Sequence, residues 1–190
     1  VTAFPDVSAV IGMVDAAIVA VPTALHAAVA IKLLEAGIGC LVEKPFVANR
    51  NEGARVVTVA KSHGAVVQIG HIERFNPAVV ALLAHLSDPS KVRTITARRI
   101  SAASARVKDI DVVMDLMVHD IDVVMALKRQ PVTHVAATGN GDHAEATLTL
   151  PAPSIAVALR ACNPSLRVPV VKDQAPDASA AAVPIRFLPS

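Results

Sequence analysis

The chain has 190 residues, 53% of them hydrophobic and 18% charged, which is enough apolar material for a large core and excludes a disordered protein. The formal net charge of +2 is too small to indicate binding to nucleic acid or to a membrane surface. Trp and Tyr are absent, so the chain lacks the side chains on which single-stranded nucleic acids usually stack.

Alternating strands and helices are predicted in the first part of the chain. The apolar run at residues 16–21, which ends at Pro22, is typical of a strand buried on both faces of a parallel sheet. A helix capped by Thr23 is expected to follow and to end at Gly37. The pattern then repeats as a strand at 39–42, a helix from Asn49 or Asn51 to Gly64, and a strand at 65–69. This order predicts a parallel α/β sheet, which binds ligands at the carboxyl ends of its strands.

The pattern changes after Gly70, and we place a domain boundary between residues 1–76 and 77–190. A helix is expected to begin at Pro77. The second part is predicted to be an α+β domain with a mainly antiparallel sheet, made of a strand at 92–100, a helix at 109–127, and strands at 132–138, 144–150 and 155–162. No regular structure is assigned to the proline-rich tail from Asn163.

Polar residues follow the first two predicted strands. In the first motif, Val-Pro-Thr-Ala-Leu-His at 21–26, the Thr23 hydroxyl and the helix N-terminus can hold a phosphate or ribose. A helix cap beside a partly buried His26 is the alternative. In the second motif, Glu43-Lys44-Pro45, Lys44 can act as an acid, a base or a donor to a substrate hydroxyl. A surface ion pair is the alternative, and the position at the ligand edge favours the functional interpretation.

Three ionisable residues share one face of the helix expected at 109–127. Asp115, His119 and Asp122 are spaced by four and three residues, close to the period of about 3.6 residues per turn. A carboxylate that orients an imidazole is a familiar acid–base arrangement. The surrounding apolar residues indicate that this helix is buried. A solvated acidic stripe and a divalent-metal site are the alternatives, and we assign no metal.

Four motifs follow one another along residues 15–150. They are the segment at 21–26, Leu-Val-Glu-Lys-Pro at 41–45, Gly-His-Ile-Glu-Arg-Phe-Asn-Pro at 70–77, and Asp-Leu-Met-Val-His-Asp at 115–120. Together they resemble the glucose-fructose oxidoreductase, inositol dehydrogenase and MocA (Gfo/Idh/MocA) family of nicotinamide-dependent oxidoreductases. The resemblance implies that residues 1–76 are the C-terminal half of a Rossmann-like dinucleotide-binding domain. Residues 77–190 would be a substrate and oligomerisation domain that is short for the family.

The resemblance also implies hydride transfer between NAD or NADP and a secondary alcohol of a sugar, cyclitol or nucleotide sugar. Lys44, Asp115 and His119 would be the catalytic residues. His119 would take the hydroxyl proton, Lys44 would stabilise the alkoxide, and Asp115 would orient His119 or bind a substrate hydroxyl. The residues expected near the nicotinamide and its ribose are Pro22, Thr23, His26, Glu43 and Lys44.

The chain departs from the family because no GxGxxG motif follows any predicted strand. That loop brings backbone amides to the pyrophosphate, so we expect this chain alone to bind a dinucleotide weakly or not at all. The residue that separates NAD from NADP would lie in the same missing half. Since the sequence begins at Val1, we expect a longer protein. A catalytically silent fragment or relative that keeps the fold for binding or oligomerisation is the alternative.

The segments at 70–77 and 106–113 look like the branch that acts on nucleotide-activated amino sugars, of the UDP-N-acetylglucosamine 3-dehydrogenase kind. Candidate substrate-binding residues are Arg74, Asn76 and Arg99. Six cations between Asp88 and Asp109 could hold a diphosphate, although a solvated sheet edge is an equal alternative. They are Lys91, Arg93, Arg98, Arg99, Arg106 and Lys108.

Cys40 and Cys162 lack the spacing of a metal site or a disulfide framework, which favours a reducing cytoplasm. The uncharged run at 16–31 is shorter than the roughly 20 residues of a membrane-spanning helix. We therefore expect a cytoplasmic dimer or tetramer that acts on a small molecule, without a nucleic-acid or membrane partner.

Overall fold

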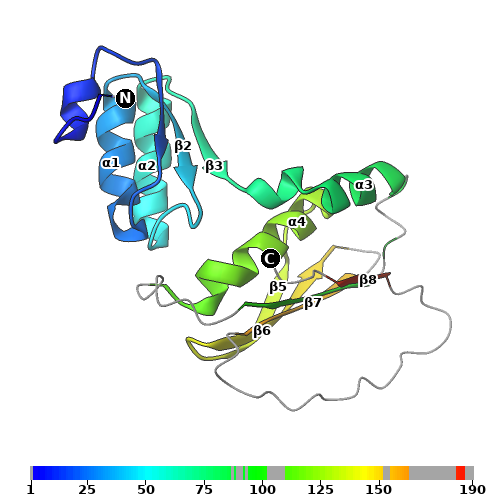
Figure 1. The fold of residues 1–190 in the computed structure, drawn as a ribbon. Helices are drawn as coiled ribbons and strands as arrows, with labels where there is room; N and C mark the ends of the chain where they lie inside the picture. Colours follow the sequence, from blue (N-terminus) through cyan, green and yellow to red (C-terminus); the bar gives the residue numbers. More distant parts are fainter. Residues whose placement is uncertain are drawn as a thin grey trace, which may run out of the picture. The chain divides into compact units, whose positions relative to one another are not determined.

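The computed structural model describes residues 2–86, 88, 92, 94–101, 110–151, 155–162 and 183–186. They belong to two compact units, Val1–His71 and Ile72–Ser190, each with its own hydrophobic core (Figure 1). The units divide before residue 76, the boundary predicted from the sequence. The reason is that the 3₁₀ turn η2 (Ile72–Phe75) packs against α3 (Pro77–His85) and α4 (Val118–Lys128) of the second unit.

The first unit is a three-stranded parallel sheet with two helices. The strand order is β1-β2-β3, with β1 at Ala16–Val19, β2 at Gly39–Glu43 and β3 at Val67–Gly70. The helices are α1 (Thr23–Glu35) and α2 (Arg50–Ser62), and a short 3₁₀ turn, η1 (Val7–Val10), precedes β1. This arrangement confirms the α/β pattern predicted for the first part of the chain.

The helix ends explain why these segments are helical. Of the two predicted starts of α2, Asn49 is the cap, because its side chain accepts a hydrogen bond of 3.0 Å from the Glu52 amide. Gly37, with φ of 76°, ends α1 in a left-handed conformation that favours glycine. The prediction that Thr23 caps α1 is wrong, since Thr23 is the first helical residue and its side chain is buried.

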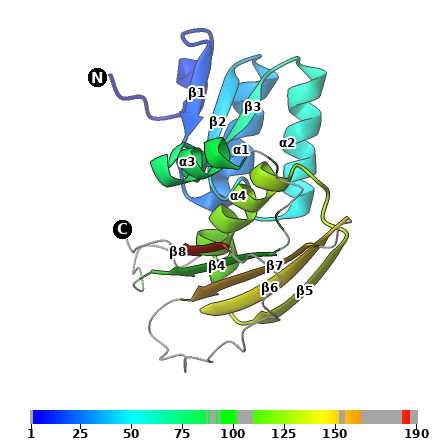
Figure 2. The same ribbon diagram turned by 90° about the vertical axis from the view of Figure 1, so that its right-hand side faces the viewer.

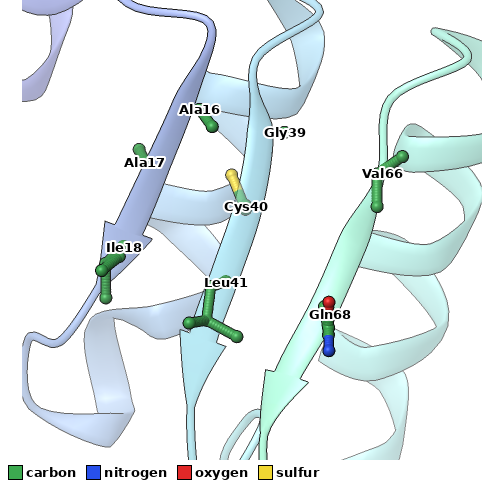
Figure 3. A pocket seen from close by; sticks show the side chains of 8 residues that line it. All are labelled: Ala16, Ala17, Ile18, Gly39, Cys40, Leu41, Val66 and Gln68. Carbon is green, nitrogen blue, oxygen red and sulfur yellow. The ribbon is translucent and has the colours of Figure 1, made fainter.

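Only one face of this sheet is covered by helices within the first unit. The β1–α1–β2 and β2–α2–β3 crossovers run in the same direction, so right-handed connections place both helices on the same face (Figure 1). The prediction that β1 is buried on both faces is therefore wrong, and Ile18 is 70% exposed. Figure 3 shows the shallow hollow on the sheet, lined by Ala16, Ala17, Ile18, Gly39, Cys40, Leu41, Val66 and Gln68.

The second unit contains a five-stranded mixed sheet in the order β5-β6-β7-β4-β8. The bounds are β4 Thr94–Ile100, β5 His134–Gly139, β6 His143–Leu150, β7 Ile155–Cys162 and β8 Val183–Arg186. The predicted antiparallel pairing of the three consecutive strands β5, β6 and β7 is confirmed. However, β4 pairs in parallel with β7 and β8, because the connection after β4 passes through α4 before the sheet resumes. The expectation of no regular structure in the tail is wrong at β8.

Helix α4 runs along one face of this sheet (Figure 2). The prediction of one regular helix at 109–127 is wrong in its first part, because a π-helical turn, η4 (Val113–Met117), precedes α4. The Asp111 carboxylate starts this turn by accepting hydrogen bonds from the amides of Val113 and Met114 at 3.1 and 2.9 Å. The predicted burial of this helical segment is confirmed, because the core of the second unit contains Val112, Met117, Val123, Val124 and Leu127. Residue 109 lies outside the described residues.

Candidate functional site

The structure brings together the two motifs that follow β1 and β2. Both strands end at the same edge of the parallel sheet. His26 connects the loops there, since its Nδ1 lies 2.9 Å from the Pro45 carbonyl oxygen and its Nε2 lies 2.8 Å from the Val21 carbonyl oxygen. The His26 residue is only 2% exposed. His26 would therefore act on a ligand through the two loops, rather than by direct contact.

The loop bonds of His26 give a prediction for stability. His26→Phe keeps a ring in the core but leaves the carbonyl of Pro45 without its hydrogen bond, so we expect the free energy of unfolding to fall by about 2 kcal/mol. Urea unfolding of the full-length protein measures this loss. His63→Phe is the matched control, because the His63 ring is exposed and makes only local bonds at the end of α2. Equal losses in both variants would show that His26 does not fasten the loops.

Glu43 and Lys44 lie at the end of β2, next to Gly70 at the end of β3. Glu43 and Gly70 are paired in register, and a methyl group on Gly70 would lie 3.1 Å from the Glu43 carboxylate oxygen Oε2. Glycine thus leaves room for that carboxylate over the strand end. Lys44 is half-buried, and its peptide bond to Pro45 is cis.

The N-terminus of α1 faces the same edge of the sheet. Pro22, which is exposed, precedes the helix, and no side chain caps it. An uncapped helix N-terminus is suited to a negatively charged or dipolar ligand group. The structure therefore places four of the predicted cofactor residues, Pro22, Thr23, Glu43 and Lys44, at this edge, with His26 beneath them.

In the second unit, Asp115 lies in the π turn and His119 lies in the first turn of α4. The π turn contains more residues than a turn of α-helix. The period of about 3.6 residues, from which Asp115, His119 and Asp122 were predicted to share one face, therefore does not apply to this segment. Asp122, the third expected member, is 7% exposed and bound to Arg74. The role of Asp115 in orienting His119 stays a prediction.

The three candidate substrate-binding residues all have partners within the second unit. Arg74 Nε donates to Asp122 Oδ2 at 2.8 Å, and Arg99 Nη2 donates to Asp120 Oδ1 at 3.0 Å. Asn76 is the N-cap of α3, and its Nδ2 donates to Glu73 Oε2 at 3.1 Å. Their contact with substrate stays a prediction.

Sequence reasoning missed Asp120 as a partner of this site. Its signal was a carboxylate inside an apolar helix, where a cation or several hydrogen bonds must compensate the charge. Burial raises the pKa of Asp120, the hydrogen bond and charge of Arg99 lower it, and the charge of Glu73 raises it again. Glu73 Oε1 also lies 3.4 Å from Arg99 Nη1.

Of the six cations considered for a diphosphate, the structure describes two, Arg98 and Arg99. Arg99 turns toward Asp120 of α4, whereas its strand neighbour Arg98 is exposed on the other face of β4. Lys91, Arg93, Arg106 and Lys108 lie outside the described residues, as does most of the segment at 106–113.

Within the part of the chain that the structure describes, no three His, Cys, Asp or Glu side chains are grouped to hold a metal ion. Asp122, one of the three residues of the metal alternative, is bound to Arg74. Among the described residues, no helix has the length and apolar character needed to cross a membrane.

The chain is similar to known oxidoreductases. The family described as "Oxidoreductase family, NAD-binding Rossmann fold" matches residues 1–71. UDP-N-acetylglucosamine 3-dehydrogenase of Acidithiobacillus ferrooxidans is 37% identical over 155 residues, which cover 78% of this chain and 49% of the relative. Inositol 2-dehydrogenase of Acidothermus cellulolyticus is 28% identical over 148 residues, covering 75% of this chain and 43% of the relative.

Solved structures of dehydrogenases have a similar fold. The solved structure of the Acidithiobacillus ferrooxidans enzyme superposes with a TM-score of 0.77 at 35% identity, covering 85% of this chain and 55% of that chain. Myo-inositol 2-dehydrogenase of Lactobacillus plantarum shares the fold, with a TM-score of 0.74 at 18% identity over 84% of this chain and 55% of that chain. The chain thus spans about half the length of these relatives.

Proposed function

Because this chain belongs to the Gfo/Idh/MocA oxidoreductase family, we propose that the full-length protein transfers a hydride between NAD or NADP and a secondary alcohol of a UDP-activated amino sugar. The observation that carries this proposal is the 37% identity to UDP-N-acetylglucosamine 3-dehydrogenase over 155 residues, since the matched length exceeds either compact unit alone. Sugar and cyclitol alcohols are the wider substrate class, which the inositol dehydrogenase relatives support.

The donor set at the edge of the first sheet fits the nicotinamide and ribose end of the cofactor. An ammonium group, a carboxylate and an uncapped helix N-terminus lie together there, at Lys44, Glu43 and α1. Pro22 and Thr23 would border the ring, and His26 would hold the two loops in place. The sequence contains no glycine-rich loop for the pyrophosphate, so this chain supplies one part of the cofactor site.

In the proposed mechanism, the imidazole of His119 accepts the proton of the substrate hydroxyl. The proposed role of Lys44 is to stabilise the negative charge of the alkoxide. Asp115 orients the His119 ring or binds a neighbouring hydroxyl. The bound nicotinamide supplies the hydride acceptor. Arg74, Asn76 and Arg99 are the proposed contacts to substrate, in addition to the intramolecular bonds that they make.

The direct test is oxidation of UDP-N-acetylglucosamine by the full-length protein with NAD or NADP. We expect reduced cofactor to form, followed by its absorbance, with a higher kcat/KM for the nucleotide sugar than for myo-inositol. A higher kcat/KM for myo-inositol would show that the substrate is a cyclitol and not a UDP-activated amino sugar. A protein that binds the cofactor but oxidises neither alcohol would favour the catalytically silent relative. The cytoplasmic location and the dimer or tetramer stay predictions.

A further inference from the structure

Two buried carboxylates on α4 have no part in the mechanism described above. Asp120 is 2% exposed and Asp122 is 7% exposed, although the residues around them are mostly apolar. Buried carboxylates are expensive to desolvate and persist only where a cation or several hydrogen bonds compensate the charge. Asp120 immediately follows His119, so both carboxylates lie in the part of the helix that presents the proposed base.

The compensating cations come from two different elements. Arg99 on β4 binds Asp120 through Nε and Nη2, at 3.2 and 3.0 Å from Oδ1. Arg74 on η2 forms two hydrogen bonds with the Asp122 carboxylate, of which the one from Nε is 2.8 Å long. Paired arginine–carboxylate hydrogen bonds of this kind fix direction as well as distance.

The fully buried apolar residues of α4 lie on one face of the helix. Val123, Val124 and Leu127 fall within about 100° around the helix axis and belong to the core of the second unit. Asp120 and Asp122 are about 200° apart around the helix axis, at about 100° per residue. The two arginines therefore hold the helix from different sides, and Arg74 binds it away from the face formed by these apolar residues.

We propose that Asp120 and Asp122 are positioning residues, which, through Arg99 and Arg74, fix the rotation of the first turn of α4 and so the orientation of the His119 imidazole. This inference rests on the proposed function, in which His119 accepts the substrate proton. In this inference, Arg74 acts through Asp122 and Arg99 acts through Asp120. The effect of breaking either pair on the His119 ring can be measured without substrate.

The test uses Asp122→Asn and Arg74→Gln in the full-length protein, each alone and then together. Asn keeps the shape of the Asp122 side chain, and Arg74 is half-exposed, so both variants are expected to fold. We expect the ring NMR signal of His119, assigned with His119→Asn, to move in each variant and to move no further in the double variant. We also expect kcat to fall by about 10- to 100-fold with little change in the KM for the cofactor, since misplacement of a catalytic group slows chemistry.

Glu145→Gln is the matched control, because Glu145 and Arg160 form an arginine–carboxylate pair of 2.6 Å between β6 and β7, away from α4. We expect neither the His119 signal nor kcat to change in it. An unchanged His119 signal in the folded Asp122→Asn and Arg74→Gln variants would overturn the inference. If the wild-type protein oxidises no alcohol, the proposed function fails, whereas the NMR comparison still decides the positioning role.

Discussion

Replacing Lys44 by Met in the full-length protein is expected to lower kcat/KM at least about 100-fold, and replacing His119 by Asn is expected to do the same. Met removes the ammonium group that we propose stabilises the developing alkoxide, but keeps the length and apolar character of the side-chain stem. Asn removes the imidazole that we propose as the proton acceptor. Steady-state oxidation of the nucleotide sugar measures both losses, and circular dichroism verifies that the variants fold.

Matched controls separate catalysis from general effects of charge or volume. Lys61 is exposed on α2 and His85 is exposed on α3, so Lys61→Met and His85→Asn change the same residue types elsewhere. We expect kcat/KM within about twofold of wild type in both, as for surface substitutions that change stability by no more than about 0.5 kcal/mol. Near-normal turnover in the Lys44 and His119 variants would contradict the catalytic assignment.

The second large effect concerns the pair formed by Arg99 and Asp120. Arg99→Met is expected to lower the free energy of unfolding by about 3–5 kcal/mol, because it leaves the Asp120 carboxylate buried without its cation. Urea unfolding of the full-length protein, followed by a probe in the second unit, measures the change. The double variant Arg99→Met with Asp120→Leu is expected to recover most of the loss, since it removes the unpaired charge as well.

The effect of Arg99→Met should also depend on pH. Burial holds the pKa of Asp120 in the folded protein above its usual value. Protonation of Asp120 is therefore more favourable in the folded than in the unfolded protein. The contribution of Asp120 to stability is then complete below the unfolded pKa and is lost as the pH rises through the folded pKa. Arg99 lowers that pKa, so its removal raises it further. The variant should lose more stability at neutral than at mildly acidic pH.

Arg98→Met provides the control for this pH dependence, because Arg98 is the exposed neighbour on the opposite face of β4. Its loss should be no more than about 0.5 kcal/mol. An Arg99→Met variant that loses no more than this control, or that loses the same amount at both pH values, would show that the ion pair is not what keeps Asp120 in the core.

The local pattern of the sequence was sufficient for the elements of the first unit and for the position of its polar motifs. Apolar runs at 16–21, 39–42 and 65–69 predicted the parallel strands. Gly37 and the pair Asn49 or Asn51 marked helix ends, because caps and turns depend on a few neighbouring residues. The alternation of strands and helices also predicted that Glu43 and Lys44 lie at the carboxyl edge of the sheet. The family resemblance lies in these motifs together with those at 70–77 and 115–120.

Only the tertiary structure decided which distant groups meet. The parallel pairing of β4 with β7, the contact of His26 with the Pro45 carbonyl, and the partners of Arg74 and Arg99 all join residues that are far apart in the sequence. The π turn before α4 and the exposed face that holds Ile18 likewise depend on how the surrounding elements pack. Periodicity states which residues are apolar, but burial and charge compensation are properties of the folded chain, since they depend on contacts that close long loops.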